Sequence, residues 1–218
     1  MADPDRGPCI YVLAGTNGAG KSSIGGAGFR RLGAETFDPD EAARRIRAAN
    51  PTIELSEANS AAWYEGTRLL KRAITERRDF AFETTLGGRT IPGLLRKALS
   101  LHLEARIWYA GLSSPELHIA RVRARVAKGG HDIPEEMIRK RYDASRLHLI
   151  ELLPELTELR VYDNTAESDP AAGVAPTPML VLHMAKGRIA GTCELAAVPA
   201  WAKPILAAAF KSDAQNRG

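Results

Sequence analysis

Cysteine is scarce in this sequence, and long apolar runs are absent from it. Only two of its 218 residues are cysteines, Cys9 and Cys193, and they lack the Cys-x-x-Cys spacing of zinc and redox sites. Neither a zinc site nor a disulfide framework is therefore indicated. No stretch approaches the length of a membrane span. The opening residues, MADPDRGP, carry early acidic side chains and no apolar core, unlike a secretory signal. We expect a cytoplasmic protein that does not contact a membrane.

A strong excess of charge of one sign is also missing. The chain has 30 Lys and Arg against 26 Asp and Glu, a formal net charge of +4, and the basic residues are spread along it. This small excess fits an anionic ligand but is weak evidence for nucleic acid, so no nucleic-acid partner is expected. Internal repeats and low-complexity tracts are absent, and the length suits one α/β domain with room for a small appendage.

The strongest signal is the stretch IYVLAGTNGAGKSS, residues 10–23. Its apolar beginning, 10–14, predicts a buried strand, and 15–22 fit the pattern G-x-x-x-x-G-K-[ST]. Such a loop turns successive backbone N–H groups inward around an anion, and the helix after it adds positive potential. Lys21 can reach the outer phosphates, and the Ser22 hydroxyl is placed to bind Mg²⁺. The pattern predicts a nucleoside triphosphate site made of Gly15, Thr16, Asn17, Gly18, Ala19, Gly20, Lys21, Ser22 and Ser23.

The rest of the chain alternates between predicted strands and helices. Strands are predicted at 10–14, 35–37, 79–82, 103–110 and 158–162. Helices are predicted at 22–32, 42–49, 55–77, 90–99, 115–126 and 135–152. This alternation indicates a P-loop NTPase fold, with a parallel sheet of about five strands covered by helices on both faces.

The C-terminal part is predicted to differ from this alternating core. Residues 169–178 are rich in Pro, Ala and Gly and are typical of a linker or flexible loop. Segments 179–184 and 189–195 flank a turn and predict a β-hairpin, and a last helix is predicted at 200–210. We therefore divide the chain into a core, 1–168, and a C-terminal part, 169–218, packed on that core.

Carboxylate side chains follow two of the predicted strands. Ligands of an open parallel sheet gather at the C-terminal ends of its strands, where Asp38, Asp40 and Glu83 would meet the phosphate loop. One carboxylate could accept a proton from a substrate hydroxyl, and another could hold the acceptor or tune the Mg²⁺ shell. Asp38 could equally be a helix N-cap, and Glu83 an ordinary polar residue at a strand end. Asp40 fits the catalytic role better. The predicted substrate-binding residues are Asp38, Asp40, Glu83, Thr84 and Thr85.

Two arginine-rich helices are separated by a glycine pair at 129–130. Arg121 and Arg125 are four residues apart and share a helix face, which in most helices is a solvated surface. The glycine break favours another interpretation, a hinged lid around 115–142. Its closure would bring guanidinium groups onto the phosphates and expel water. His131 would then be a donor to phosphate or substrate, or merely a loop residue. Trp63, Trp108 and Trp201 are interpreted as packing residues rather than a base-stacking platform.

Several segments together resemble the zeta toxin family of P-loop kinases. They are LAGTNGAGKSS, TFDPDEAAR, FAFETTLGG and RVRARVAKGGHDIPEEMIRKRY followed by YDN, within residues 10–164. The resemblance implies an ATP- and Mg²⁺-dependent kinase that phosphorylates a sugar hydroxyl of UDP-N-acetylglucosamine, with an antitoxin protein as a partner. It implies that Lys21 and Ser22 bind phosphate and Mg²⁺ and that Asp40 is the general base. It further implies that Glu83 and Thr84 bind the acceptor and that Asn164 lies near the adenine.

The sequence departs from this family at the lid. His131 stands where the studied toxins carry an arginine, so the cation of the lid remains open among Arg125, Arg139 and Arg141. The expected catalytic set is Asp40, Lys21, Arg121, Arg125, Arg141 and His131. Two alternatives remain. One is a kinase for another nucleotide sugar, a nucleoside or an antibiotic. The other is an ATP-dependent regulatory switch with no small-molecule acceptor.

Overall fold

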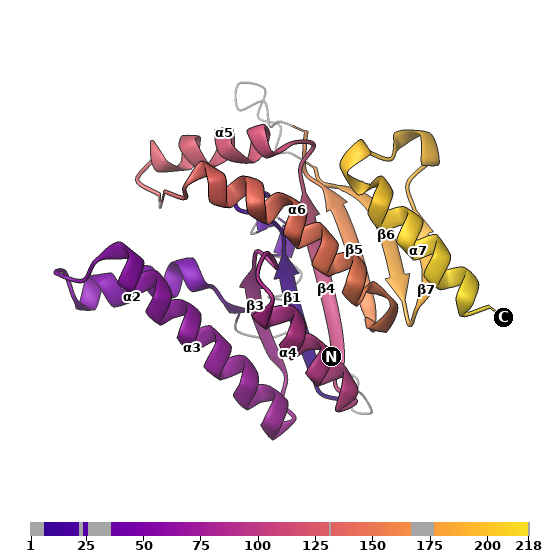
Figure 1. Ribbon diagram of the computed structural model, residues 1–218, viewed down its shortest axis with the longest axis horizontal. Helices are drawn as coiled ribbons and strands as arrows, with labels where there is room; N and C mark the ends of the chain where they lie inside the picture. The colour runs from indigo at the N-terminus through magenta and orange to yellow at the C-terminus, as the bar shows by residue number, and fades with distance from the viewer. Residues whose placement is uncertain (1–6, 22–23, 26–35, 131, 167–176, 218) are drawn as a thin grey trace.

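A seven-stranded sheet organises the molecule (Figure 1). The computed structural model describes residues 7–21, 24–25, 36–130, 132–166 and 177–217. The strands lie in the order β2-β3-β1-β4-β5-β6-β7. They are β1 (Cys9–Ala14), β2 (Thr36–Phe37), β3 (Phe80–Thr84), β4 (Glu104–Gly111), β5 (Glu158–Asp163), β6 (Met179–Ala185) and β7 (Arg188–Thr192).

The first five strands of this order are parallel, as the sequence predicts. In the central strand, Val12 pairs with Phe82 of β3 on one side and with Ile107 of β4 on the other. Every residue of β1 is buried, which explains its uninterrupted apolar sequence. The predicted P-loop NTPase fold is confirmed. The helix predicted at 22–32 lies largely outside the described residues.

The helices agree with the sequence in place and differ at some ends. They are α2 (Pro39–Ala49), α3 (Leu55–Glu76), α4 (Thr90–Ser100), α5 (Pro115–Val126), α6 (Glu135–Leu152) and α7 (Lys203–Gln215). Short 3₁₀ turns lie at Leu153–Glu155, Leu195–Ala197 and Ala200–Ala202. Helix α2 begins three residues earlier than predicted, at Pro39, because proline suits the first turn and Asp38 caps it. Helix α7 covers 203–215 rather than 200–210, because residues 200–202 form a 3₁₀ turn instead.

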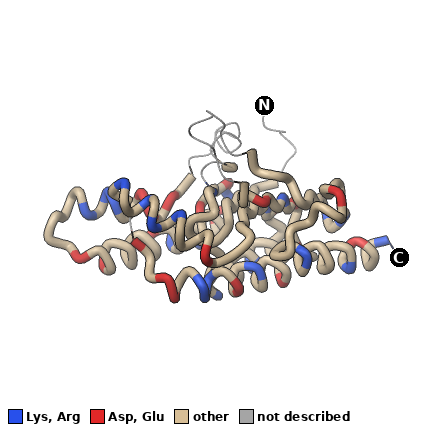
Figure 2. The backbone as a smooth tube through the Cα atoms, turned by 90° about the horizontal axis from the view of Figure 1, so that it is seen from above, with Lys and Arg blue, Asp and Glu red and all other residues tan. Residues whose placement is uncertain are grey.

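One hydrophobic core joins the sheet to the helices on one face. Alternate residues of β1, such as Ile10 and Val12, pack in the same cluster as buried side chains of α3, α4, α6 and α7. These four helices lie on the same side of the sheet in Figure 1. Figure 2 shows basic and acidic residues interspersed along the chain, in line with the spread charge of the sequence. No described helix has the length and apolar character needed to cross a membrane.

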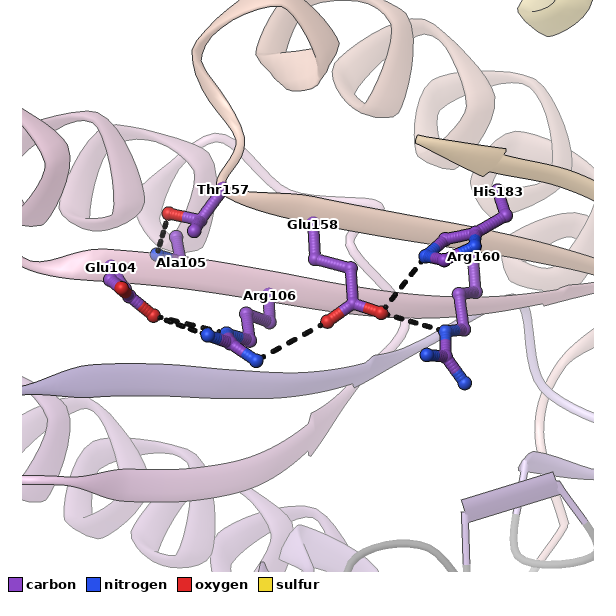
Figure 3. A network of polar contacts seen from close by, with 7 residues as sticks. All are labelled: Glu104, Ala105, Arg106, Thr157, Glu158, Arg160 and His183. Carbon is purple, nitrogen blue, oxygen red and sulfur yellow. Dashed lines mark hydrogen bonds and ion pairs between the residues drawn. The ribbon is translucent and has the colours of Figure 1, made fainter. Parts of the chain in front are cut away.

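The opposite face of β4, β5 and β6 carries a charged network (Figure 3). The Glu158 carboxylate is 3.4 Å from Arg106 Nη1 and 2.7 Å from Arg160 Nε. Its Oε1 also lies 3.2 Å from His183 Nε2. The Arg160 guanidinium stacks over the Trp108 ring at 5.4 Å. These side chains of β4, β5 and antiparallel β6 share one face because successive residues of a strand point to opposite faces.

The hairpin and α7 extend the core sheet. Strand β6 pairs antiparallel with β5, and β7 pairs antiparallel with β6. Leu182 of β6 and Leu206 of α7 belong to the same buried cluster as β1. Strand β7 covers 188–192, shorter than the predicted 189–195 at its end. The linker predicted at 169–178 lies almost wholly outside the described residues.

Candidate functional site

The phosphate loop follows β1 at the C-terminal edge of the parallel strands. Gly15, Gly18 and Gly20 all have positive φ values, of 139°, 82° and 76°. At Gly18 a Cβ atom would lie 2.7 Å from the carbonyl oxygen of His118, so only glycine allows this approach to α5. Lys21 Nζ donates to the Gly15 carbonyl at 3.2 Å, which places the ammonium within the loop. The predicted residues Ser22 and Ser23 lie outside the described residues.

His118 of α5 contacts the backbone of this loop, and no sequence pattern predicted this role. Its Nδ1 lies 2.8 Å from the carbonyl oxygen of Asn17, which can only accept a hydrogen bond. Nδ1 therefore carries the proton. Burial lowers the pKa of His118 to about 4, and neighbouring Lys21 opposes its protonation further. A neutral imidazole thus fixes the backbone of the loop. A lone histidine on a helix gives no sequence signal for this role.

A second support comes from α6. Arg141 Nη1 donates to Asn17 Oδ1 at 2.8 Å, and Thr16 Oγ1 donates to the Arg141 carbonyl at 3.4 Å. Burial lowers the pKa of the Arg141 guanidinium, while Asp40 opposes that shift. An arginine stays charged at neutral pH even so. Arg141 therefore presents a partly buried cation next to the phosphate loop.

Asn164, just after β5, contacts the opposite side of the loop. Its Nδ2 donates to the Ala19 carbonyl at 2.9 Å. Its Oδ1 is buried and has no hydrogen-bond partner among the described residues. A buried acceptor without a partner is costly unless a ligand supplies the donor. This unsatisfied acceptor fits a ligand that donates a hydrogen bond.

The carboxylates after β2 lie at the start of α2. Asp38 Oδ1 accepts the Asp40 N–H at 2.9 Å and so caps the helix, as one of the two interpretations of the sequence holds. The Asp40 carboxylate instead faces α5, where its Oδ2 lies 3.5 Å from Arg125 Nη1. Both side chains of this ion pair are about two fifths exposed. Asp40 is therefore accessible, and Arg125, one of the predicted lid cations, lies beside it.

Glu83, the second-last residue of β3, lies beside these carboxylates. Burial raises the pKa of Glu83 to about 7, Lys21 acts in the opposite direction, and Asp38 and Asp40 reinforce the rise. Near neutral pH its carboxyl group can therefore either accept or donate a hydrogen bond. The hydroxyls of the next two residues stabilise the turn after β3. Thr84 Oγ1 accepts the Leu86 N–H at 3.0 Å, and Thr85 Oγ1 accepts the Gly87 N–H at 3.4 Å.

One cleft of about 1320 Å³ brings most of the predicted residues together. Helices α3 and α6 contribute to its walls. Among the residues predicted from sequence, those lining it are Asn17, Lys21, Asp38, Asp40, Glu83, Thr84, Thr85 and Arg141.

Other predicted residues lie elsewhere. Arg121 is not among the described residues that line the cleft, and its Nη2 donates to the carbonyl oxygens of Thr165 and Ala166 at 3.4 and 3.3 Å. Arg139 pairs with Glu116 at 2.6 Å on an exposed surface. The predicted lid residue His131 lies outside the described residues. Of the three predicted lid cations, Arg141 lines the cleft, and Arg125 pairs with Asp40, which also lines it.

The tryptophans divide into two kinds. Trp201 is buried in the core, as expected of a packing residue. Trp63 of α3 is 42 % exposed and lines the cleft instead. The packing interpretation of the sequence is therefore wrong for Trp63. Helical spacing made it part of an apolar face, but the sequence does not show which part of that face is left uncovered.

Comparison with known proteins places this geometry in context. The chain matches no family model. It is 32 % identical over 129 residues to an uncharacterized protein of Haemophilus influenzae (strain ATCC 51907 / DSM 11121 / KW20 / Rd), covering 59 % of this chain and 88 % of that protein. The chain belongs to the same family as that protein.

Solved structures share the fold at low sequence identity. The AvrRxo1-ORF1:ORF2 complex with ATP matches with a TM-score of 0.67 at 13 % identity, over 94 % of this chain and 64 % of that one. This chain thus spans less than two thirds of the length of that chain. The PezAT chromosomal toxin–antitoxin system of Streptococcus pneumoniae matches with a TM-score of 0.54 at 10 % identity, over 81 % and 76 % of the two chains. The protein has the fold of the zeta-toxin-like P-loop kinases.

Proposed function

We propose that the protein is a kinase that transfers the γ-phosphoryl group of ATP to a hydroxyl group of a small acceptor. The observation that carries this proposal is the shared cleft of Lys21 and Asp40, in which Asp40 also pairs with Arg125. A phosphate-loop cation, a carboxylate and a nearby arginine are the parts that phosphoryl transfer requires, since the reaction depends on positioning and charge.

The proposed roles follow from the side chains. Asp40 takes the proton of the acceptor hydroxyl. The oxygen of that hydroxyl then bonds to the γ-phosphorus of ATP, and the bond between the γ-phosphorus and the bridging oxygen that stays with ADP breaks. Its ion pair with Arg125 keeps a cation within reach of the same centre. Lys21 and Arg141 add positive charge from the phosphate loop side, where negative charge spreads over the transferred group.

The described residues fit bound ATP with Mg²⁺. The loop cradle and the unpartnered Asn164 Oδ1 fit a nucleotide. No described cluster of three or more His, Cys, Asp or Glu could hold a metal ion alone. Mg²⁺ in such sites rests largely on phosphate oxygens and water, so it needs few protein ligands. Ser22 is the expected ligand, and bound Mg²⁺ would supply charge neutralisation across the phosphates.

We take a UDP-activated amino sugar, UDP-N-acetylglucosamine, as the first acceptor to test. Glu83, Thr84 and Thr85 line the cleft next to Asp40, where an acceptor hydroxyl must lie to reach it. An antitoxin partner is proposed as well, supported by the toxin–antitoxin context of the PezAT structure with the same fold.

The test is transfer of labelled γ-phosphate from ATP with Mg²⁺ to a panel of UDP-sugars, in the wild type and in Asp40→Asn. Removing a general base is expected to slow transfer about 100-fold or more. ATP affinity should change little, because Asp40 does not belong to the phosphate loop. The matched control is Glu41→Gln, the next residue of α2, whose carboxylate pairs with Arg45.

Three outcomes separate the possibilities. Labelled acceptor in the wild type and in Glu41→Gln, but not in Asp40→Asn, supports the reaction and the base. Loss of ATP binding in Asp40→Asn would make Asp40 a metal or folding residue. ADP release without a labelled acceptor from any panel member would contradict the transfer and favour the regulatory switch.

A further inference from the structure

The turn between β3 and α4, residues 85–89, has a backbone conformation that its sequence does not favour. Leu86 in this turn has a φ of 55°, in the left-handed region that side chains such as leucine rarely adopt. Its side chain is only 1 % exposed and belongs to the main hydrophobic core. A conformation of this kind persists only where the surrounding structure fixes it.

Both backbone polar groups of Leu86 are bonded to side chains. Its N–H donates to Thr84 Oγ1 at 3.0 Å, and its carbonyl oxygen lies 2.8 Å from Nδ1 of His148, on α6. A carbonyl oxygen can only accept a hydrogen bond, so Nδ1 carries the proton and donates it. The first bond is local, whereas the second joins residues 62 positions apart. His148 therefore fixes the strained residue to a helix outside the turn.

The same face of α6 also holds the phosphate loop. Arg141 lies seven residues before His148, about two helical turns, so the two side chains share a face. Arg141 Nη1 donates to Asn17 Oδ1 at 2.8 Å. Gly87, next to Leu86, approaches Arg141 so closely that a Cβ atom would lie 2.7 Å from Arg141 Cγ. One face of α6 thus contacts both the phosphate loop and the turn after β3.

This turn adjoins the residues that the proposed reaction uses on its acceptor side. Glu83, Thr84 and Thr85 line the cleft. The Thr84 hydroxyl accepts the Leu86 N–H, and the Thr85 hydroxyl accepts the Gly87 N–H. A rotation of the backbone at Leu86 would break these bonds and displace both hydroxyls. The conformation of Leu86 therefore decides where the acceptor-side groups lie.

We propose that His148 is a positioning residue for the acceptor side of the cleft. Its hydrogen bond keeps Leu86 in the left-handed conformation, and the turn then holds Thr84 and Thr85 in place. His148 acts through the backbone of the turn, as His118 does through the backbone of the phosphate loop. This inference rests on the proposed kinase function, because it assigns the turn to the acceptor of that reaction.

Two variants of equal shape test the hydrogen bond. His148→Asn keeps an amide N–H at the place of Nδ1, whereas His148→Leu has the same branched shape and no donor. Without the bond, only a fraction of the molecules should hold the turn in its binding conformation. The KM for UDP-N-acetylglucosamine, or for the panel member that is labelled, should rise about 10-fold in His148→Leu, while kcat and the KM for ATP stay within about 2-fold.

His148→Asn should restore most of the acceptor KM, because its amide can donate to the Leu86 carbonyl. A role in packing alone would instead affect both variants alike. An acceptor KM that is equal in the wild type and in His148→Leu would overturn the inference, and so would an equal rise in both variants.

Glu151→Gln is the matched control. Glu151 lies three residues after His148 on α6, lines the same cleft and pairs with Arg96 of α4 at 2.8 Å. The substitution weakens an exposed contact between the two helices and leaves the bond to Leu86 intact. Its acceptor KM should equal that of the wild type. A rise as large as in His148→Leu would assign the effect to looser packing of α4 on α6 and overturn the role of His148.

Hydrogen exchange followed by NMR tests the same bond without turnover. The N–H groups of Leu86 and Gly87 donate within the turn, so their exchange reports its order. Both should exchange about 10-fold faster in His148→Leu and at nearly the wild-type rate in His148→Asn. Exchange in the central strand β1 should be unchanged. An unchanged rate at Leu86, or an equal acceleration in β1, would overturn the inference.

The two proposals fail in different ways. If the wild type labels no acceptor, but exchange in the turn is fast in His148→Leu and restored in His148→Asn, the kinase function is contradicted and His148 remains the residue that fixes the turn. If the acceptor is labelled with a KM that does not depend on the side chain at position 148, this inference is contradicted and the kinase remains.

Discussion

Beside the phosphate loop, Glu83 is half-buried and His118 is buried, and loss of contact with water favours the neutral form of each. The pKa of Glu83 rises from 4.5 to about 7, and that of His118 falls from 6.5 to about 4. Because the pKa of Glu83 is higher in the folded chain, the folded protein loses stability as pH increases from 4.5 to 7, where the unfolded chain releases this proton first. Because the pKa of His118 is lower in the folded chain, the folded protein loses stability as pH decreases from 6.5 to 4, where the unfolded chain takes up this proton first. The two trends oppose each other between pH 4.5 and 6.5.

Glu83→Gln should remove the first trend. Glutamine keeps the shape of the side chain and cannot ionise, so the variant should gain stability relative to the wild type as pH rises. The gain should reach up to about 3 kcal/mol between pH 4.5 and 7, which urea unfolding on either side of this range measures. Glu41→Gln, at an exposed site, is the control. An offset from the wild type that is equal at both ends of the range would contradict the raised pKa.

His118→Gln should remove the second trend. A glutamine amide can still donate to the Asn17 carbonyl, but it does not titrate. The variant should therefore lose less stability than the wild type as pH falls from 6.5 to 4, by up to about 3 kcal/mol. The exposed His102→Asn serves as control. If His118→Gln declines as steeply in acid as the wild type, then His118 is not the group that titrates.

At the scale of elements, the glycine pair after α5 is a helix cap. Gly129 has a φ of 84°, and its N–H donates to the Val126 carbonyl at 2.9 Å. The Gly130 N–H donates to the Arg125 carbonyl at 2.9 Å. These two bonds form a Schellman motif, which requires a left-handed residue that glycine supplies without cost. The pair therefore fixes the end of α5 that carries Arg125 toward Asp40.

Gly130→Ala tests this positioning of Arg125. A Cβ atom there would lie 2.6 Å from Arg125 Cγ and 2.8 Å from its carbonyl oxygen, so the arginine has to shift. We expect phosphoryl transfer to slow about 10-fold, since small misplacements at a reacting centre are costly. ATP affinity should change little. Gly93→Ala, where a Cβ atom meets nothing within 4 Å, is the control. A normal transfer rate in Gly130→Ala would show that the position of Arg125 is not critical.

The sequence predicts elements well where the signal is local. The central strand at 10–14 and the helices at 115–126 and 135–152 agree with the structure within one residue, because apolar runs and helical spacing report burial directly. The phosphate loop is equally local, since its pattern specifies a turn. His118 could not be found this way. Its role depends on the carbonyl of a residue far away in the sequence, which leaves no pattern along the chain.

The same limit applies to the whole molecule. The hairpin at 179–192 has a local turn signal, but its pairing with β5 is a contact between segments far apart in sequence. Trp201 then links this part to the end of β5, because its Nε1 donates to Asp163 Oδ1 at 2.8 Å. Its ring packs so closely on Gly111 of β4 that a side chain there would overlap it. The C-terminal part therefore supports the strand ends that precede Asn164.

This shared core predicts that the C-terminal part is needed for folding. A chain ending at Ala166 would leave β5 as an open edge and uncover the apolar side chains that β6 and α7 bury, such as Leu159 and Val161. We expect it to lack the near-ultraviolet circular dichroism of a packed core and a cooperative thermal transition, whereas the full chain should unfold in one transition. Trp201→Phe, which removes the hydrogen bond to Asp163 and part of the ring packed on Gly111, should keep that transition and lose roughly 3 kcal/mol of stability. A chain ending at Ala166 that unfolds cooperatively and binds ATP would instead make the hairpin and α7 an appendage of an independent core.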